Sequence, residues 1–381
     1  MPTFVQSVLP LDTTHTSDSH LGTHKSTSNT SLTVSHLSRT ISYITRKSID
    51  IVSPSQISIF PATSSVASHV IGILQKQHPH LRLRLAARSP EKLKANGDRL
   101  KVAQTPLSID RVSSIKDALE GSDAAFILHP PLHLAGDPFA LSKTFVDTII
   151  EAANTSKTLK RIVYLTSMAA EKPTGSGNIR SVHIGETALL ANLRDGIDLV
   201  ALRPSYFLSN FSPVLPLALN PPHILPSMLI PFDKAYPLID ASAIAAKAVK
   251  YLVASQLSSP EAASQGSLTA VQLIPEFKTV PQIAEYLSEI IGTKVNAVPI
   301  PEEEWASTFK KAGMSDQNVA MYIEMLGGFI RDELSFLDQE GIEQEKKRGV
   351  TVIDEQTDVD HEAALTQLID DIKAAGGQQG H

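Results

Sequence analysis

Cysteine is absent from the 381-residue chain. Its absence excludes disulfide bonds, thiolate catalysis and metal or iron–sulfur sites that use cysteine ligands. An excess of positive charge is also missing, because 34 Lys and Arg stand against 40 Asp and Glu, for a net charge of −6. Binding to nucleic-acid phosphates needs a basic surface, so we expect no nucleic-acid partner. The chain also lacks any stretch near the roughly 20 consecutive apolar residues of a membrane span, and we expect no membrane partner.

The first 50 residues lack glutamate and any hydrophobic periodicity, and 20 of them are Ser or Thr. Such a segment buries too little apolar surface to offset its loss of conformational entropy, so residues 1–50 are predicted to be a disordered or weakly ordered extension. A mitochondrial targeting peptide is disfavoured, because no arginine precedes Arg39 and because Asp12 and Asp18 are acidic. The start also has no apolar run typical of a secretory signal. We therefore expect a cytoplasmic protein.

From Gln56 onward, short apolar runs alternate with amphipathic segments. This alternation predicts a parallel sheet with crossover helices, the arrangement of a doubly wound α/β protein. The expected strands are 57–60, 81–87, 100–103, 124–128, 161–165 and 198–202, and the expected helices are 66–77, 89–95, 113–120, 138–153 and 182–193.

Beyond Pro204 the alternation weakens, and six prolines interrupt the apolar segment 212–232. Proline disfavours a regular helix or a central strand, so this segment is expected to be irregular. The last 81 residues carry 18 acidic and 7 basic residues, which we interpret as a solvated helical surface. The predicted organisation is a doubly wound α/β domain at 56–250 that includes a pocket segment at 205–235, a C-terminal part at 251–350, and an acidic helical tail at 351–381.

The loop after the first strand lies where a nucleotide-binding fold holds the pyrophosphate of its cofactor. Residues 59–70, IFPATSSVASHV, resemble the G-A-T-G-x-x-G opening of the NmrA-like family of atypical short-chain dehydrogenases/reductases. Further segments resemble the family's pattern in the same order, over residues 56–335. They are LAARSPEKL at 85–93, SIKDALEGSDA at 114–124, VYLTS at 163–167, VALRPSYFLSN at 200–210, and PEEEW with AGMS within 301–315.

This resemblance implies a Rossmann-type doubly wound parallel sheet with a smaller α+β C-terminal substrate-binding part. It also implies NADP as the cofactor and an oxidoreductase-type enzyme of secondary-metabolite biosynthesis. The members after which the family is named imply an alternative, which is a non-catalytic regulator that senses NAD(P).

All three glycines of the family's loop are replaced, by Pro61, Ser64 and Ala67. Pro61 has no N–H for a phosphate, and Ser64 places a Cβ where the motif's backbone approaches the ligand. The hydroxyls of Thr63, Ser64 and Ser65, next to Val66 at the helix start, could donate hydrogen bonds to phosphate instead. The loop is therefore either a modified dinucleotide site or a structural turn without a cofactor.

Arg88 follows the second strand, where the family places a basic residue against the 2′-phosphate of NADP. A guanidinium binds phosphate through two hydrogen bonds, and Lys92 lies one turn further on. No acidic residue stands at this strand end, so NADP is favoured over NAD. The alternative is that Arg88 is a surface arginine at a charged helix start.

The Tyr-x-x-x-Lys pair of the wider superfamily is missing after Ser167. His183 and Glu186 stand on the comparable helix, three residues apart and so on one face. A histidine titrates near neutrality and could transfer a proton, while Glu186 stabilises its charged form and Ser167 bonds a substrate oxygen. A solvated pair at a helix start is the alternative interpretation of His183 and Glu186.

His129 follows the fourth strand, at the carboxyl end where such sheets bind ligands, and we assign it to the cofactor site. No acidic partner lies near it in the sequence, so we expect no metal site. Tyr206, Phe207 and Asn210 follow the sixth strand and are expected to bind substrate, unless they belong to the core.

The apolar segment 212–232 would wall a pocket, so the expected partner is a small, largely apolar organic molecule. Its reaction is predicted to be NADPH-dependent reduction or a redox-neutral isomerisation or cyclisation. The missing glycines and the missing Tyr-x-x-x-Lys pair weaken the case for reduction and leave the redox-neutral reaction and the regulator open.

Overall fold

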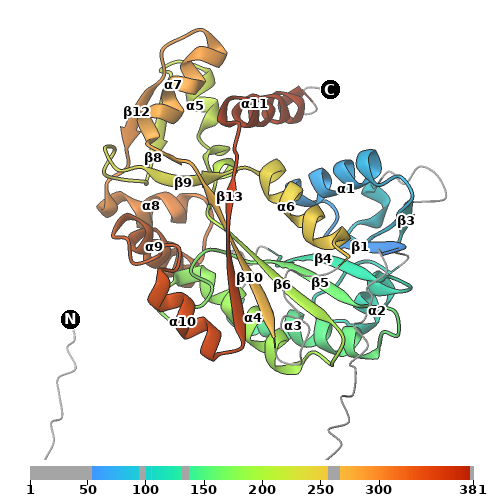
Figure 1. Cartoon of the computed structure of the whole chain (residues 1–381). Helices are drawn as coiled ribbons and strands as arrows, with labels where there is room; N and C mark the ends of the chain where they lie inside the picture. The colour runs from blue at the N-terminus through green and yellow to red at the C-terminus, as the bar shows by residue number, and fades with distance from the viewer. Residues whose placement is uncertain (1–53, 94–99, 104, 131–136, 256–266, 378–381) are drawn as a thin grey trace, which may run out of the picture. The chain divides into compact units, whose positions relative to one another are not determined.

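The computed structural model describes residues 54–93, 100–103, 105–130, 137–255 and 267–377, and the predicted extension at 1–50 lies outside these residues. In the described part, eight strands form one sheet in the order β13-β10-β6-β5-β4-β1-β2-β3, and every neighbouring pair is parallel (Figure 1). The order reverses between β1 and β4, as in a doubly wound Rossmann sheet. The strands are β1 Gln56–Phe60, β2 Arg82–Leu85, β3 Leu100–Val102, β4 Ala124–Leu128, β5 Arg161–Leu165, β6 Asp198–Pro204, β10 Leu268–Pro275 and β13 Val350–Thr357.

The central strands β1, β4, β5 and β6 are buried along their whole length, which explains their continuous apolar sequences. Alternate residues face opposite sides, so Phe126 packs toward one layer of helices while Ile127 packs toward the other. The first layer holds α1 Ser65–Gln77 and α6 Ala241–Val253, and the second holds α2 Val112–Leu119, α3 Pro138–Thr155 and α4 Arg180–Asn192 (Figure 1). The predicted α/β class and doubly wound sheet are confirmed.

Several helices start where a side-chain cap satisfies the first free N–H groups. Asp137 caps α3 and Asp240 caps α6. The predicted helix at 89–95 is reduced to a single 3₁₀ turn, η1 Pro90–Lys92, before the described chain stops at residue 93.

The C-terminal part forms a second apolar core around Trp305, which is fully buried and donates its indole N–H to the Ile300 carbonyl. Two small sheets belong to this part: β8 Ile224–Ser227 with β12 Asn296–Pro299, and β7 Tyr206–Phe207 and β11 Phe277–Lys278 on either side of β9 Tyr236–Ile239. Its helices are α5 Leu215–Leu219, α7 Val280–Ile291, α8 Glu302–Lys311, α9 Asp316–Ile330, α10 Gln339–Lys347 and α11 His361–Gly377.

The stretch predicted to be an acidic helical tail, 351–381, begins with a strand instead. Strand β13 pairs along its length with β10 and extends the main sheet, and α11 follows it. Its acidic residues, the exposed Asp354 and the buried Glu355, hid the strand in the sequence, because an edge strand needs apolar residues on only part of its surface. Among the described helices, none is long and apolar enough to cross a membrane.

Glu355 ties β13 to the helix layer. Its carboxylate accepts hydrogen bonds from Lys247, Lys250 and Tyr251 of α6. Burial opposes its ionisation, but these three donors outweigh burial and hold the pKa of Glu355 at about 2.

We expect Glu355→Gln to lower the free energy of unfolding at pH 7 by on the order of 2 kcal/mol, because three donors lose a charged acceptor. The folded-state pKa lies below that of the unfolded chain. The stabilisation is therefore complete above pH 4.5 and is lost as the pH falls toward 2. Urea unfolding between pH 7 and pH 3 measures it. Glu362→Gln, at an exposed position of α11, is the control, and a difference from wild type that is the same at pH 7 and pH 3 would contradict the assignment.

Candidate functional site

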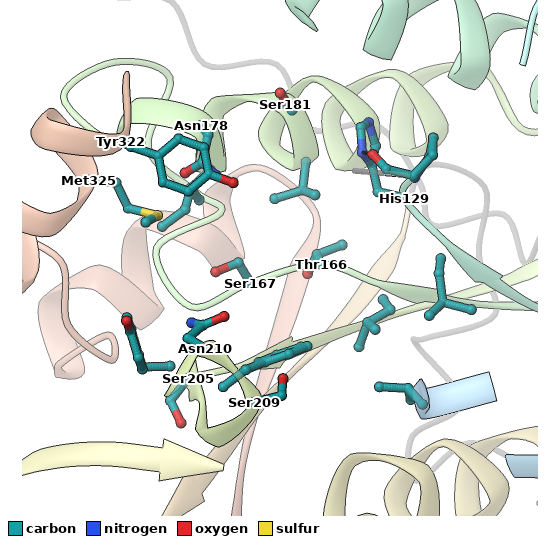
Figure 2. Close-up of a pocket in the computed structure, with 18 of the residues that line it drawn as sticks. His129, Thr166, Ser167, Asn178, Ser181, Ser205, Ser209, Asn210, Tyr322 and Met325 are labelled. Atoms are coloured by element: carbon teal, nitrogen blue, oxygen red, sulfur yellow. Dashed lines mark hydrogen bonds between the residues drawn. The ribbon is translucent and has the colours of Figure 1, made fainter. Parts of the chain in front are cut away.

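A cavity of about 400 Å³ lies at the carboxyl ends of β4, β5 and β6, beside the reversal of strand order between β1 and β4 (Figure 2). Ligands bind at this edge of open α/β sheets. The start of α1 forms one end of the cavity, with Ser64, Ser65 and Val66. Residues of α9, including Tyr322 and Met325, form the other end.

No Asp, Glu, Lys or Arg is found among the described residues that line the cavity. His129 is the one histidine among them. Its Nδ1 lies 2.9 Å from the Pro130 carbonyl oxygen and its Nε2 lies 2.7 Å from Ser142 Oγ. Desolvation lowers the pKa of His129 to about 4, which the bond to Pro130 only partly opposes, so the imidazole is neutral at pH 7. The cavity therefore carries no formal charge along its described walls.

Ser64 caps α1 from within the predicted phosphate loop. Its Oγ accepts a hydrogen bond from the Ala67 N–H at 3.1 Å, so the chain itself occupies one donor that a phosphate could use. The N–H groups of Ser65 and Val66, in the first helical turn, have no acceptor among the described residues. Thr63 is exposed and does not line the cavity.

Arg88 is exposed at the end of β2, and no described residue pairs with its guanidinium. Lys92 belongs to η1, and Arg88 does not line the cavity. With two open N–H groups, the Ser65 hydroxyl and Arg88, the described residues fit a dinucleotide phosphate. A further N–H group of the loop, that of Ala67, is already bonded to the Ser64 cap and is not free for a phosphate.

The structure brings neither His183 nor Glu186 into the cavity wall. The imidazole Nδ1 of His183 lies 2.8 Å from the Ala170 carbonyl oxygen. Glu186 is 4% exposed. Its two carboxylate oxygens accept hydrogen bonds from the Arg203 guanidinium, at 3.1 and 2.5 Å. The predicted pairing of His183 with Glu186 is therefore wrong. A buried carboxylate needs a buried cation, and Arg203 on β6 satisfies Glu186 better than a half-exposed imidazole does.

Arg203 is also bonded to two carboxylates besides Glu186. Its guanidinium donates to Glu345 of α10 at 2.8 Å and to Glu171 at 3.4 Å, and Arg348 also pairs with Glu345. Burial raises the pKa of Glu171 above its usual value, against the attraction of Arg203. The guanidinium thus joins β6, α4 and α10, and the residues that follow Arg203 in the chain include several that line the cavity.

Ser167, Tyr206, Phe207 and Asn210 line the cavity, as do Ser64, Ser65, Val66 and His129. These placements agree with the positions expected from the ends of the strands, and the functional roles of these residues stay predictions. The apolar segment 212–232, which was expected to wall the pocket, contributes no residue to the described cavity wall, because its apolar side chains pack into the C-terminal core. The wall supplied by α9 was missed. Its cavity residues include Met321, Met325 and Phe329, whose four-residue spacing marks one helix face in the sequence but does not distinguish a core face from a cavity wall.

Gly177 lets the loop at η2 Gly177–Ile179 dock on α9. Its φ of +56° is in the left-handed region, and a Cβ there would lie 2.0 Å from the Met321 carbonyl oxygen. Its N–H donates to the Glu324 carboxylate at 3.1 Å. This docking places Asn178 beside Tyr322 at the α9 end of the cavity (Figure 2).

A model of the NAD(P)H-binding family matches residues 62–208. This part of the chain is therefore similar to NAD(P)H-binding domains, in agreement with the resemblance to the NmrA-like atypical short-chain dehydrogenases/reductases. Agroclavine dehydrogenase of Claviceps fusiformis is 24% identical to it over 219 residues, which are 57% of this chain and 68% of the relative.

Two solved structures share the Rossmann fold of this chain. One is the NADPH-dependent quinone oxidoreductase of Escherichia coli complexed with NADPH, at 20% identity and a TM-score of 0.60. The alignment covers 82% of this chain and 99% of the oxidoreductase. The other is the triphenylmethane reductase of Citrobacter sp. complexed with NADP(H), at 18% identity and a TM-score of 0.57. That alignment covers 77% of this chain and 95% of the reductase.

We expect Ser64→Gly to bind NADPH about 3- to 10-fold more tightly than wild type. The change frees the Ala67 N–H for a phosphate and costs the helix only a few tenths of a kcal/mol. Fluorescence titration measures the dissociation constant. Ser68→Ala is the matched control, because that exposed hydroxyl bonds the Ser64 carbonyl and does not line the cavity. Unchanged affinity in Ser64→Gly would contradict the competition between cap and phosphate.

Removing Arg203 should destabilise the protein strongly. We expect Arg203→Met to cost about 3–5 kcal/mol, because Glu186 and Glu345 stay buried without their shared cation. Urea unfolding at pH 7 measures the loss. In the control Arg331→Met, the half-exposed pairs with Glu302 and Glu333 should contribute about 1 kcal/mol or less. Equal losses in the two variants would show that the Arg203 cluster does not hold the fold together.

Proposed function

We propose that the protein is an NADPH-dependent reductase of a small, uncharged and largely apolar organic molecule. One observation carries the proposal: a cavity whose described walls are uncharged runs from the first turn of α1 to an apolar wall on α9. A dinucleotide held at α1 would extend along the ends of β4 and β5, and the remaining space would take a ligand against α9. The absence of charge on the described walls favours a neutral ligand, because an ionic group would be desolvated there without a partner.

Different residues along this cavity would bind the different parts of the cofactor and the substrate. The N–H groups of Ser65 and Val66 would hold the pyrophosphate, and Arg88 would bind the 2′-phosphate. A bound NADPH supplies a hydride. The Ser167 hydroxyl, at the end of β5, would bond a polar atom of the substrate, while the apolar walls exclude water from the reacting atoms.

The named relatives support this class of substrate. Agroclavine dehydrogenase, quinone oxidoreductase and triphenylmethane reductase are names of enzymes that act on organic molecules. By analogy with the first of these, we place the substrate in secondary metabolism.

A second candidate is a redox-neutral enzyme or a regulator that senses NAD(P) without catalysis. The Ser64 cap and Pro61 favour this candidate, because the cap occupies the Ala67 N–H and Pro61 has no N–H, so the loop has fewer donors for a pyrophosphate. The position of His183 outside the cavity wall favours it as well, since the predicted proton donor of a reductase is then missing from α4.

Titration with NADPH, followed by NADPH oxidation at 340 nm with 1,4-naphthoquinone as a test acceptor, separates these functions. Binding with turnover supports the reductase. Binding without turnover on a panel of neutral ketones and quinones supports the regulator. An absence of NADPH binding would overturn both functions that need the cofactor.

If Arg88 bonds the 2′-phosphate, Arg88→Ala should weaken NADPH binding about 10- to 100-fold, the range for charge-assisted hydrogen bonds, and should leave NADH binding nearly unchanged. Parallel fluorescence titrations with the two nucleotides measure the ratio. Arg82→Ala removes another exposed arginine of β2 and should change neither affinity. Equal weakening of NADPH and NADH in Arg88→Ala would remove Arg88 from the 2′-phosphate site.

A further inference from the structure

His129, at the end of β4 in the cavity wall, belongs to a short chain of hydrogen bonds (Figure 2). Its imidazole Nδ1 lies 2.9 Å from the Pro130 carbonyl oxygen, and its Nε2 lies 2.7 Å from the hydroxyl oxygen of Ser142 on α3. The fully buried Ser142 hydroxyl also lies 2.6 Å from the Ser181 carbonyl oxygen at the start of α4. The chain therefore ends at both sides on a backbone carbonyl, which accepts a hydrogen bond and has no proton to donate.

These three contacts need three protons, but a neutral imidazole and one hydroxyl supply only two. If the ring proton is on Nδ1, the Ser142 proton can bond either Nε2 or the Ser181 carbonyl, and not both. If the ring proton is on Nε2, the lone pair of Nδ1 faces the Pro130 carbonyl oxygen. Only the imidazolium, with a proton on each ring nitrogen, makes all three hydrogen bonds at once. The arrangement around His129 is thus one proton short in its neutral form.

The free protein does not supply this proton at neutral pH, because burial holds the pKa of His129 at about 4. No carboxylate among the described residues of the cavity wall faces the ring, and Tyr206 and Tyr322 in that wall have raised pKa values and are neutral. The titratable groups on the surrounding helices have other partners. On α3 and its cap, Asp137 bonds two backbone N–H groups and Lys143 pairs with Asp147; on α4, Arg180 packs over Phe139, His183 contacts the Ala170 carbonyl and Glu186 pairs with Arg203; on α1, His69 contacts the Ser65 carbonyl.

His129 lies beside the loop that would hold the phosphates of the cofactor. Strands β1 and β4 are neighbours, with Phe60 opposite Ile127, so the loop into α1 and the segment at His129 leave the sheet at the same edge. Both line the same cavity. A dinucleotide would bring a negative charge on each of its phosphates into this cavity. Among the described wall residues, His129 is the one basic side chain that can balance this charge.

We infer that binding of the dinucleotide is coupled to the uptake of a proton by His129, which thereby becomes a cation of the phosphate site. The phosphates favour the charged imidazole, and the added proton completes the bonds to Pro130, Ser142 and Ser181. The positive charge offsets part of the attraction that the loop loses through its missing N–H groups. This inference rests on the cofactor-binding part of the proposed function and adds to it a residue and a proton.

Calorimetric titration of the full-length protein with NADPH at pH 7, in PIPES and in Tris buffer, measures the proton uptake. The two buffers give up a proton with different heats, so the difference in binding heat counts the protons. The 2′-phosphate of NADPH titrates near pH 6, so each result is compared with His129→Gln, in which this contribution is the same. We expect wild type to take up about 0.5–1 proton more per bound NADPH than His129→Gln.

The affinity should depend on pH in the same sense. A group whose pKa is raised by the ligand strengthens binding below the pKa of the complex, and this gain is lost as the pH rises through that value. We therefore expect the dissociation constant of NADPH to increase about 10-fold from pH 6 to pH 8 in wild type and not to increase in His129→Gln. Nitrogen-15 NMR of histidine-labelled protein is a second measurement. The signals that are absent in His129→Gln should move to imidazolium positions when NADPH is added at pH 7.

Ser142 acts through His129 as a positioning residue. Ser142→Ala removes the acceptor of the Nε2 proton, so we expect it to reduce the proton uptake by about half or more. Ser181→Ala is its matched control, because the backbone carbonyl that Ser142 bonds is kept. His183→Gln is the matched control for His129→Gln, because it removes a histidine that does not line the cavity. Both controls should keep the proton uptake of wild type.

NADPH binding with equal proton uptake in wild type and His129→Gln would overturn the inference and leave the cofactor proposal intact. Loss of uptake in His183→Gln as well as in His129→Gln would also overturn it, because the proton would then not belong to His129. Uptake without turnover keeps the inference and loses the reductase. A protein that gives no binding heat with NADPH in either buffer would overturn both.

Discussion

The buried guanidinium of Arg203 is the contact on which the arrangement around the cavity depends. It lies at the end of the central strand β6 and bonds carboxylates from α4 and α10, so that the sheet, a crossover helix and the C-terminal part share one cation. Shortly after it in the chain, five residues form part of the cavity wall: Ser205, Tyr206, Phe207, Ser209 and Asn210. A buried cation bonded by several carboxylates tolerates little displacement, because any shift leaves a charge without a partner in a medium of low polarity.

This arrangement separates the charged groups of the interior from the cavity. Arg203 and Arg161 are both buried and paired with carboxylates, and neither lines the cavity. The described cavity wall instead has hydroxyls, carboxamides and a neutral imidazole among apolar side chains. Such a wall binds through directional hydrogen bonds and dispersion, and it selects ligands by the placement of their donors and acceptors.

The phosphate loop shows how a local substitution changes a shared fold without disrupting it. Ala67 is fully buried between α1 and the sheet, so a methyl group replaces the glycine there without opening the packing. In place of the glycine that lets a ligand approach the backbone closely, Ser64 has a side chain that caps α1 by accepting a hydrogen bond from the Ala67 N–H. The doubly wound sheet forms with these substitutions in place, and what they change is how many donors the loop still offers to a phosphate.

The sequence by itself determined the doubly wound sheet, because fully buried parallel strands must be apolar along their length and the helices between them must carry an apolar face. It also determined which residues end β4, β5 and β6, and therefore that His129, Ser167 and Tyr206 lie at one edge. Only the tertiary structure decided the partner of Glu186, since a helical spacing shows which residues share a face and not what that face meets. Only the tertiary structure, too, placed Tyr322 in the cavity wall. Its position depends on the docking of α9 on the loop at Gly177, a contact between segments far apart in the chain that no local pattern records.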